Sequence, residues 1–197
     1  VDSFPKTIIP VYTSALSNAQ FNKNELKEQA RKDLKFYQHL ESCYVHDPYL
    51  HTLYKIVDQQ TTKLLYTFST YLSPKEKLVH FILDEQENCY LISSKTKEGQ
   101  IINTIQKISL DGRMQFQHHR KVEDGLAWEK GIQTFYIQLI HFEQETYVLG
   151  RNSEGSNLHR IDKKNGQLNL VYELIDEIKS IQTTDKGFLL VNKDSKI

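Results

Sequence analysis

The chain has 197 residues, which is long enough to bury one sizeable hydrophobic core. Its 25 lysines and arginines are balanced by 25 aspartates and glutamates, so no broad basic surface is available for nucleic acid or anionic lipid. No apolar run approaches the roughly 20 residues that a membrane-spanning helix requires, so we expect neither membrane insertion nor a nucleic-acid partner.

Residues 1–50 are predicted to form an N-terminal region that is distinct from the rest of the chain. Thr7 to Tyr12 is typical of a short extended segment. From Asn22 to about Ser42, apolar side chains recur at three- and four-residue steps, which predicts one amphipathic helix with Asn22 as its N-cap. The apolar stripe consists of Leu26, Ala30, Leu34, Tyr37 and Leu40. We expect this stripe to dock on the remaining structure.

Residues 51–197 are predicted to be an all-β region built from an internal repeat. Short apolar runs alternate with turn residues, and a basic residue followed by isoleucine recurs at Lys55, Lys107 and Arg160, at spacings of 52 and 53 residues. A second landmark, in which a polar turn leads into an aromatic and apolar strand, recurs around Tyr90 and Tyr147 and more weakly near Phe188. Together the two landmarks define a four-stranded unit.

Two such units are complete in this interpretation. Their predicted strands cover 78–83, 89–94, 102–109 and 114–119 in one unit and 135–141, 146–151, 158–162 and 168–174 in the next. The Asp111-Gly112 and Asn165-Gly166 pairs supply the positive φ angles of tight turns. The β region is expected to open with two outer strands, about 52–58 and 63–69, and to end with two inner strands, about 178–182 and 187–192.

One hairpin carries a resemblance to a known superfamily. The run from Ile161 to Leu168, Ile-Asp-Lys-Lys-Asn-Gly-Gln-Leu, resembles the hairpin of PQQ-like and YVTN-like β-propeller blades. This resemblance implies a mainly β fold of four-stranded antiparallel blades, and it transfers no functional residues. Three blades are fewer than a closed ring needs. The chain would then be part of a larger propeller, half of a homodimeric ring, or an open meander, and the first arrangement is favoured.

Four residues are candidate binding residues. His80 and His141 lie in the first strands of their units, which would line a propeller axis, although their offsets from Tyr90 and Tyr147 show that they are not equivalent. Trp128 and Leu126 lie in the glycine-flanked loop between two units, where a tryptophan either anchors an interface or packs under its own loop.

No metal or cofactor is predicted from the sequence. The adjacent pair His118-His119 would point to opposite faces of a strand, so the two rings cannot chelate one ion together. The acidic run at Asp84, Glu85 and Glu87 is typical of a solvated turn. Cys43 and Cys89 lack the spacing of a metal site and are either one disulfide or two ordinary thiols.

These patterns predict a non-catalytic protein-binding or scaffold module. A narrower version is a bacterial inhibitor or immunity-type protein that blocks a protein partner. The alternative is an enzyme or small-ligand binder whose polar residues converge at the propeller axis. The sequence does not specify the cellular compartment.

Overall fold

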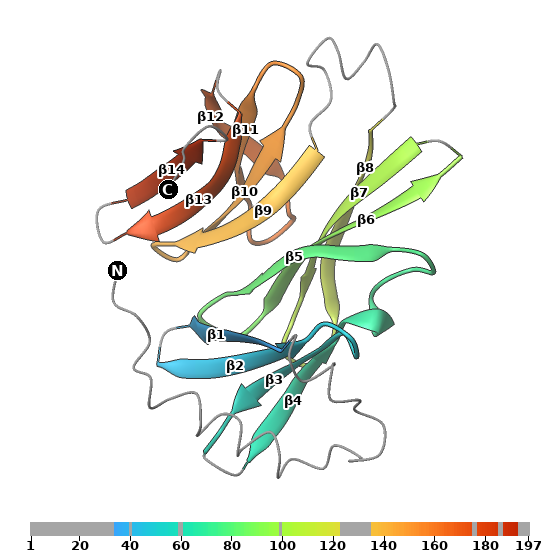
Figure 1. The fold of residues 1–197 in the computed structure, drawn as a ribbon, viewed down its shortest axis with the longest axis vertical. Helices are drawn as coiled ribbons and strands as arrows, with labels where there is room; N and C mark the ends of the chain where they lie inside the picture. The colour runs from blue at the N-terminus through green and yellow to red at the C-terminus, as the bar shows by residue number, and fades with distance from the viewer. Residues whose placement is uncertain are drawn as a thin grey trace. The chain divides into compact units, whose positions relative to one another are not determined.

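The computed structural model describes residues 34–39, 41–58, 61–98, 100–122, 135–174, 177–184 and 187–192. Within these residues the chain forms fourteen strands and one short 3-10 helix, and it divides into two compact units between Tyr71 and Leu72 (Figure 1). No helix in the described part of the chain has the length and apolar character needed to cross a membrane.

The first unit is a four-stranded antiparallel sheet. Its strands follow one another in the order β1-β2-β3-β4, and Phe68–Thr70 form the short helix η2 after the last strand. The strands are β1 (Lys35–His39), β2 (Ser42–Asp47), β3 (Thr52–Ile56) and β4 (Thr62–Thr67). Tyr66 and Phe68 are both buried, and their rings stack with centroids 6.3 Å apart.

Strands β1 and β2 correct the helix predicted from Asn22 to Ser42. Leu34, Tyr37 and Leu40 have helical spacing, but residues 35–39 pair in register with β2, from Lys35 opposite His46 to His39 opposite Ser42. Pairing with the next strand therefore outweighs the local helical period. The two strands also show that the β region does not open with two outer strands. Residues 22–33 of the predicted helix, and the extended segment at 7–12, lie outside the described residues.

The second unit confirms the two four-stranded units and adds a hairpin. One sheet has the order β5-β6-β7-β8, the next has β9-β10-β11-β12, and β13 pairs with β14. The strands are β5 (Lys77–Leu83), β6 (Cys89–Lys97), β7 (Gln100–Ile108), β8 (Met114–Val122), β9 (Phe135–Phe142), β10 (Glu145–Arg151), β11 (Ser156–Ile161), β12 (Leu168–Leu174), β13 (Ile178–Thr184) and β14 (Gly187–Asn192). The first strands are neighbours, because β9 contacts both β5 and β13.

Pairing between the second and third strands explains the repeat found in the sequence. In each four-stranded sheet the basic residue lies directly opposite a tyrosine. The pairs are Tyr44 with Lys55, Tyr90 with Lys107, and Tyr147 with Arg160. Lys107 Nζ lies 4.9 Å from the ring centroid of Tyr90, within cation–π range, and 3.5 Å from the Asp84 carboxylate. Cys43 and Cys89 each precede one of these tyrosines, and both are free thiols.

Irregularities in the ladders recur as well. Strands β5, β9 and β13 each carry one extra residue relative to their partner strand, and so do β4, β8 and β12. The extra residues are Val79, Ile137 and Lys179 in the first group and Leu65, Gln115 and Val171 in the second. A bulge increases the local twist of a sheet. The bulges of β5, β9 and β13 lie at equivalent places, and so do those of β4 and β12, whereas that of β8 lies two residues nearer the β7–β8 turn.

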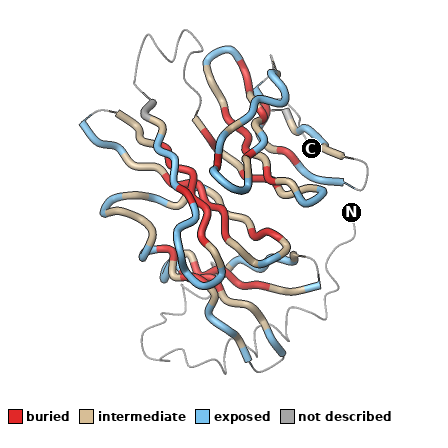
Figure 2. Tube along the Cα trace, turned by 180° about the vertical axis from the view of Figure 1, so that it is seen from behind, coloured by how far each residue is buried: buried red, intermediate tan, exposed pale blue. Residues whose placement is uncertain are grey.

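Strands β9 and β10 bury side chains on both faces of their sheet. Figure 2 shows how burial varies along the described chain. On β10, Val148 packs into a core shared with β6, β7 and β8, while Leu149 packs into a second core shared with β13. On β9, Leu139 packs into the first of these cores and Ile140 into the second. This explains why these strands read as continuous apolar runs, since a strand buried on both faces has no polar side.

Polar side chains bind the backbone of one sheet to the next at equivalent positions. The backbone N–H of Tyr136 donates to Asn103 Oδ1 at 2.7 Å, and that of Ile178 donates to Ser156 Oγ at 2.9 Å. Asn103 and Ser156 are 53 residues apart, one repeat. A second pair of contacts joins His80 to the Leu139 N–H and Gln138 to the Ile181 N–H. We call these four contacts the inter-sheet staples.

Asn103→Ala is expected to lower the free energy of unfolding by about 2 kcal/mol, because the buried N–H of Tyr136 loses its acceptor. Asn169→Ala, at an exposed position of β12, is the matched control and should change it by less than about 0.5 kcal/mol. Urea unfolding of both variants measures the difference. Equal effects would mean that the staple at Asn103 adds no stability.

Candidate functional site

His80, a predicted binding residue, joins two neighbouring strands through its ring. Its Nδ1 accepts the backbone N–H of Leu139 at 3.3 Å, which joins β5 to β9. Burial lowers the pKa of His80 to about 4, so the ring is neutral at neutral pH and can accept this bond. When the bulges are taken into account, Gln138 on β9 is the residue equivalent to His80 on β5. Its amide hydrogen-bonds both the N–H and the C=O of Ile181.

His141 forms a separate cluster with Glu85 and Thr146. Its Nε2 lies 2.7 Å from Glu85 Oε1 and its Nδ1 lies 3.1 Å from Thr146 Oγ1. Burial opposes ionisation of Glu85, but the hydrogen bond from His141 prevails and the pKa of Glu85 is below its usual range. A hydroxyl, an imidazole and a carboxylate in series resemble a catalytic triad, yet Thr146 is fully buried, so its hydroxyl is not open to a substrate.

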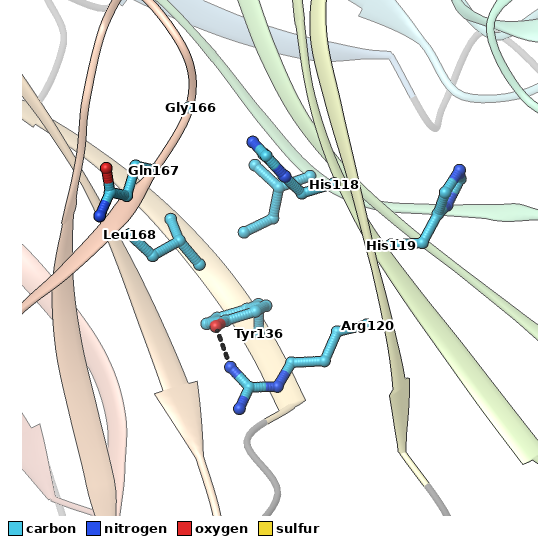
Figure 3. Close-up of a pocket in the computed structure, with 8 residues that line it drawn as sticks. His118, His119, Arg120, Tyr136, Gly166, Gln167 and Leu168 are labelled. Carbon is cyan, nitrogen blue, oxygen red and sulfur yellow. Dashed lines mark hydrogen bonds between the residues drawn. The ribbon is translucent and has the colours of Figure 1, made fainter.

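The remaining predicted residues divide into two cases. Trp128 and Leu126 lie outside the described residues, in the segment 123–134 that connects β8 to β9. His118 and His119 point to opposite faces of β8, as predicted (Figure 3). Within the described ranges, no group of three His, Cys, Asp or Glu side chains is placed to hold a metal ion.

A cleft of about 400 Å³ lies between the β5–β8 and β9–β12 sheets (Figure 3). Arg120 on β8 reaches across it, and its Nη1 donates to the Tyr136 hydroxyl at 2.7 Å. The lining residues are Ile105, His118, His119, Arg120, Tyr136, Gly166, Gln167 and Leu168. His118 contributes through its ring, whose Nε2 donates to the Asn165 carbonyl at 2.9 Å.

Gly166 closes one side of this cleft and has the positive φ that the sequence predicted, +73°. A Cβ at this position would lie 2.5 Å from Phe116 Cδ2 and 2.7 Å from His118 Nε2. The turn between β11 and β12 therefore approaches β8 more closely than a side chain would permit. Gly112, in the corresponding turn between β7 and β8, has a φ of +84° and is exposed.

Sequence reasoning missed the cleft, although a signal for it was present. Registers between the third and fourth strands place Tyr66, His118 and Tyr172 at equivalent positions, opposite Leu53, Ile105 and Leu158. Two residues further along the chain are Phe68, Arg120 and Leu174. Aromatic or aliphatic side chains therefore occupy both positions in the first and third sheets, whereas histidine and arginine occupy them in the second.

The outer edge of β14 is a second candidate site. By its register with β13, β14 corresponds to β6 and β10, with Leu190 at the position of Leu91 and Val148. Leu91 and Val148 are fully buried, but Leu190 is 42% exposed. Strands β6 and β10 are each covered on their outer edge by a third strand, and no described residue pairs with that edge of β14.

Comparisons with known proteins assign no activity. No protein-family model matches the chain, and no curated protein sequence matches it. A similar solved structure is a protein of unknown function from Bacteroides caccae, with 13% sequence identity and a TM-score of 0.42. The similarity covers 83% of this chain and 59% of that one, so the chain spans about three fifths of that protein's length.

His80→Gln is expected to keep stability at neutral pH and to reduce its loss in acid. Glutamine can accept the Leu139 N–H, as Gln138 accepts that of Ile181. In the native protein the pKa of His80 is about 4, so the unfolded state takes up a proton first as pH falls below about 6.5, and stability falls with it.

One such proton contributes at most about 1.4 kcal/mol per pH unit. Urea unfolding at several values between about pH 7 and 4.5 should show a shallower slope for His80→Gln than for the native chain. His46, with a pKa of about 4, keeps part of the slope in both. His119→Gln, at an exposed position, is the control. An unchanged slope would refute the assignment.

Gly166→Ala is expected to destabilise the protein more than Gly112→Ala. Both place alanine at a positive φ, which costs about 1 kcal/mol, but only Gly166→Ala also displaces Phe116 and His118. We expect a total of roughly 2–3 kcal/mol for Gly166→Ala in thermal or urea unfolding. Equal losses of stability in the two variants would contradict a clash between the methyl group added at position 166 and its neighbours on β8.

Proposed function

We propose that this protein is a non-catalytic binding module built on propeller-like blades, and that it binds a protein partner by accepting a β-hairpin at the outer edge of β14. The observation that carries the proposal is the exposure of Leu190 on that edge, since the equivalent residues Leu91 and Val148 are fully buried. An unpaired strand edge with exposed apolar side chains is a template for an added strand.

The arrangement of the second unit supports the comparison with propeller blades. Each sheet is an up-and-down antiparallel meander, the first strands β5, β9 and β13 are neighbours, and the inter-sheet staples recur at equivalent residues. Successive propeller blades share these features. In this interpretation β13 and β14 are the first two strands of a blade, and the partner supplies the other two.

The neighbouring sheet shows where the added hairpin would lie. Strand β13 packs against β9, and Phe188 on β14 packs on Tyr147 of β10 with ring centroids 5.3 Å apart. Because β13 lies against β9 and β14 against β10, the two strands of an added hairpin would lie over β11 and β12. Tyr172 on β12 is 59% exposed there, whereas its equivalent in the first sheet, Tyr66, is buried.

A second copy of the chain does not fit this edge. Two β14 strands paired antiparallel are related by a two-fold axis perpendicular to the shared sheet, so both copies present the same face to the same side. That side is where each β9–β12 sheet lies against its own β13–β14 hairpin, through Phe188 and Tyr147, and we infer that β11 and β12 reach past the β14 edge. The two β9–β12 sheets would therefore overlap. We accordingly assign the edge to a different protein that contributes a two-stranded hairpin with apolar residues facing Leu190 and Tyr172.

A peptide copy of the β11–β12 hairpin, residues 156–174, is a suitable probe, because this hairpin pairs with β10 in the way proposed for β14. We expect the fluorescently labelled peptide to bind the full chain, measured by anisotropy. Leu190→Lys should weaken binding at least about tenfold, since it places a charge on the docking edge.

Leu64→Lys is the matched control, because Leu64 is a similarly exposed leucine on β4. A scrambled peptide of the same composition tests for non-specific association. Equal binding by Leu190→Lys and the native chain would refute the proposed edge. So would a concentration-dependent dimer in analytical ultracentrifugation that Leu190→Lys abolishes, because that result would assign the edge to a second copy.

A further inference from the structure

The cleft beside Arg120 departs from the repeat in a way that packing does not require. At the positions that correspond to His118 and Arg120, the first unit has Tyr66 on β4 and Phe68 in η2, whose rings stack, and the β9–β12 sheet has Tyr172 and Leu174 on β12. Aromatic and aliphatic residues thus satisfy the structural demands of these positions elsewhere. A guanidinium placed at such a position indicates a role other than holding the fold together.

Arg120 keeps most of its hydrogen-bonding capacity. One of its five N–H groups donates to the Tyr136 hydroxyl, and the guanidinium carbon lies 5.8 Å from the centroid of the Tyr136 ring. Within the part of the chain that the structure describes, no carboxylate is ion-paired with Arg120. A half-buried guanidinium that no described carboxylate pairs with is suited to binding an anion from outside, in bidentate geometry.

Tyr136 is buried, and its hydroxyl holds the Arg120 guanidinium beside the cleft. Burial raises the pKa of Tyr136 even though Arg120 opposes this, so the hydroxyl keeps its proton at neutral pH. The backbone of Tyr136 is held on both sides by Asn103, which fixes the ring relative to β8.

Apolar side chains form the other walls. Ile105 on β7 and Leu168 on β12 are the aliphatic residues of the lining, and His118 lies between the two sheets (Figure 3). A volume of about 400 Å³ holds a molecule of small-metabolite size. The cleft therefore combines one cationic end with an apolar body.

We propose that this cleft binds a small organic carboxylate with an apolar chain, whose carboxylate accepts hydrogen bonds from Arg120, held in place by the Tyr136 hydroxyl, while its chain packs on Ile105 and Leu168. The apolar walls favour such a ligand over inorganic phosphate, which would leave them in contact with water. The proposal does not depend on hairpin binding at β14, because the two sites share no residue.

Hexanoate is the probe, titrated into the full chain by isothermal calorimetry or by NMR chemical-shift perturbation. We expect a Kd of about 1 mM or tighter, and no binding of hexanol at the same concentration. Arg120→Gln should weaken hexanoate binding at least about tenfold, with Arg120→Lys between this variant and the native chain, because lysine keeps the charge without the planar fork.

Tyr136→Phe keeps the buried ring and removes only the hydroxyl, so it should weaken binding roughly threefold to tenfold without unfolding the chain. Arg113→Gln, at an exposed arginine paired with Asp111 outside the cleft, should leave the Kd unchanged. The proposal is wrong if hexanoate does not bind, if hexanol or phosphate binds as well as hexanoate, or if folded Arg120→Gln binds with the native Kd.

Discussion

The second unit depends on how the first strand of each sheet is held by the sheet before it. Strands β9 and β13 begin new sheets, so their buried N–H groups have no backbone partner on the side facing the preceding sheet. An unpaired buried N–H costs about 1–3 kcal/mol, which is large against the net stability of a small domain. Asn103 and Ser156 bind the N–H of Tyr136 and Ile178, and His80 and Gln138 bind the N–H three residues later in each strand.

The inter-sheet staples also decide where the functional surfaces lie. Asn103 places Tyr136 opposite β8, which brings the phenol within hydrogen-bonding distance of Arg120 and defines one wall of the cleft. Ser156 and Gln138 place β13 over β9, so that β14 lies over β10 with one edge uncovered. A cleft between two four-stranded sheets and an edge of β14 that no described strand pairs with thus follow from the same construction.

Repetition separates structural residues from candidates for function. The tyrosine and basic pairs, the bulges and the staples recur, and their recurrence shows that each meets a demand of the sheet. His80 belongs to the recurring residues, because Gln138 likewise accepts a backbone N–H from the first strand of the next sheet. Arg120 and His118 do not, because apolar residues take their places in the other sheets. Arg120, which departs from the repeat, is therefore a better candidate for a functional role than His80, which follows it.

The sequence by itself determined the strand-rich repeat, its 52- to 53-residue spacing and the boundaries of the two complete units, because turn residues and apolar runs are local signals. It also determined the positive φ at Gly112 and Gly166. It could not separate β1 from a helix, because five residues with mixed spacing satisfy either period until β2 pairs with them. Only the tertiary structure decided which polar side chains meet across sheets. Asn103 and Tyr136 are 33 residues apart, and Arg120 gains its partner only when β8 and β9 are packed face to face.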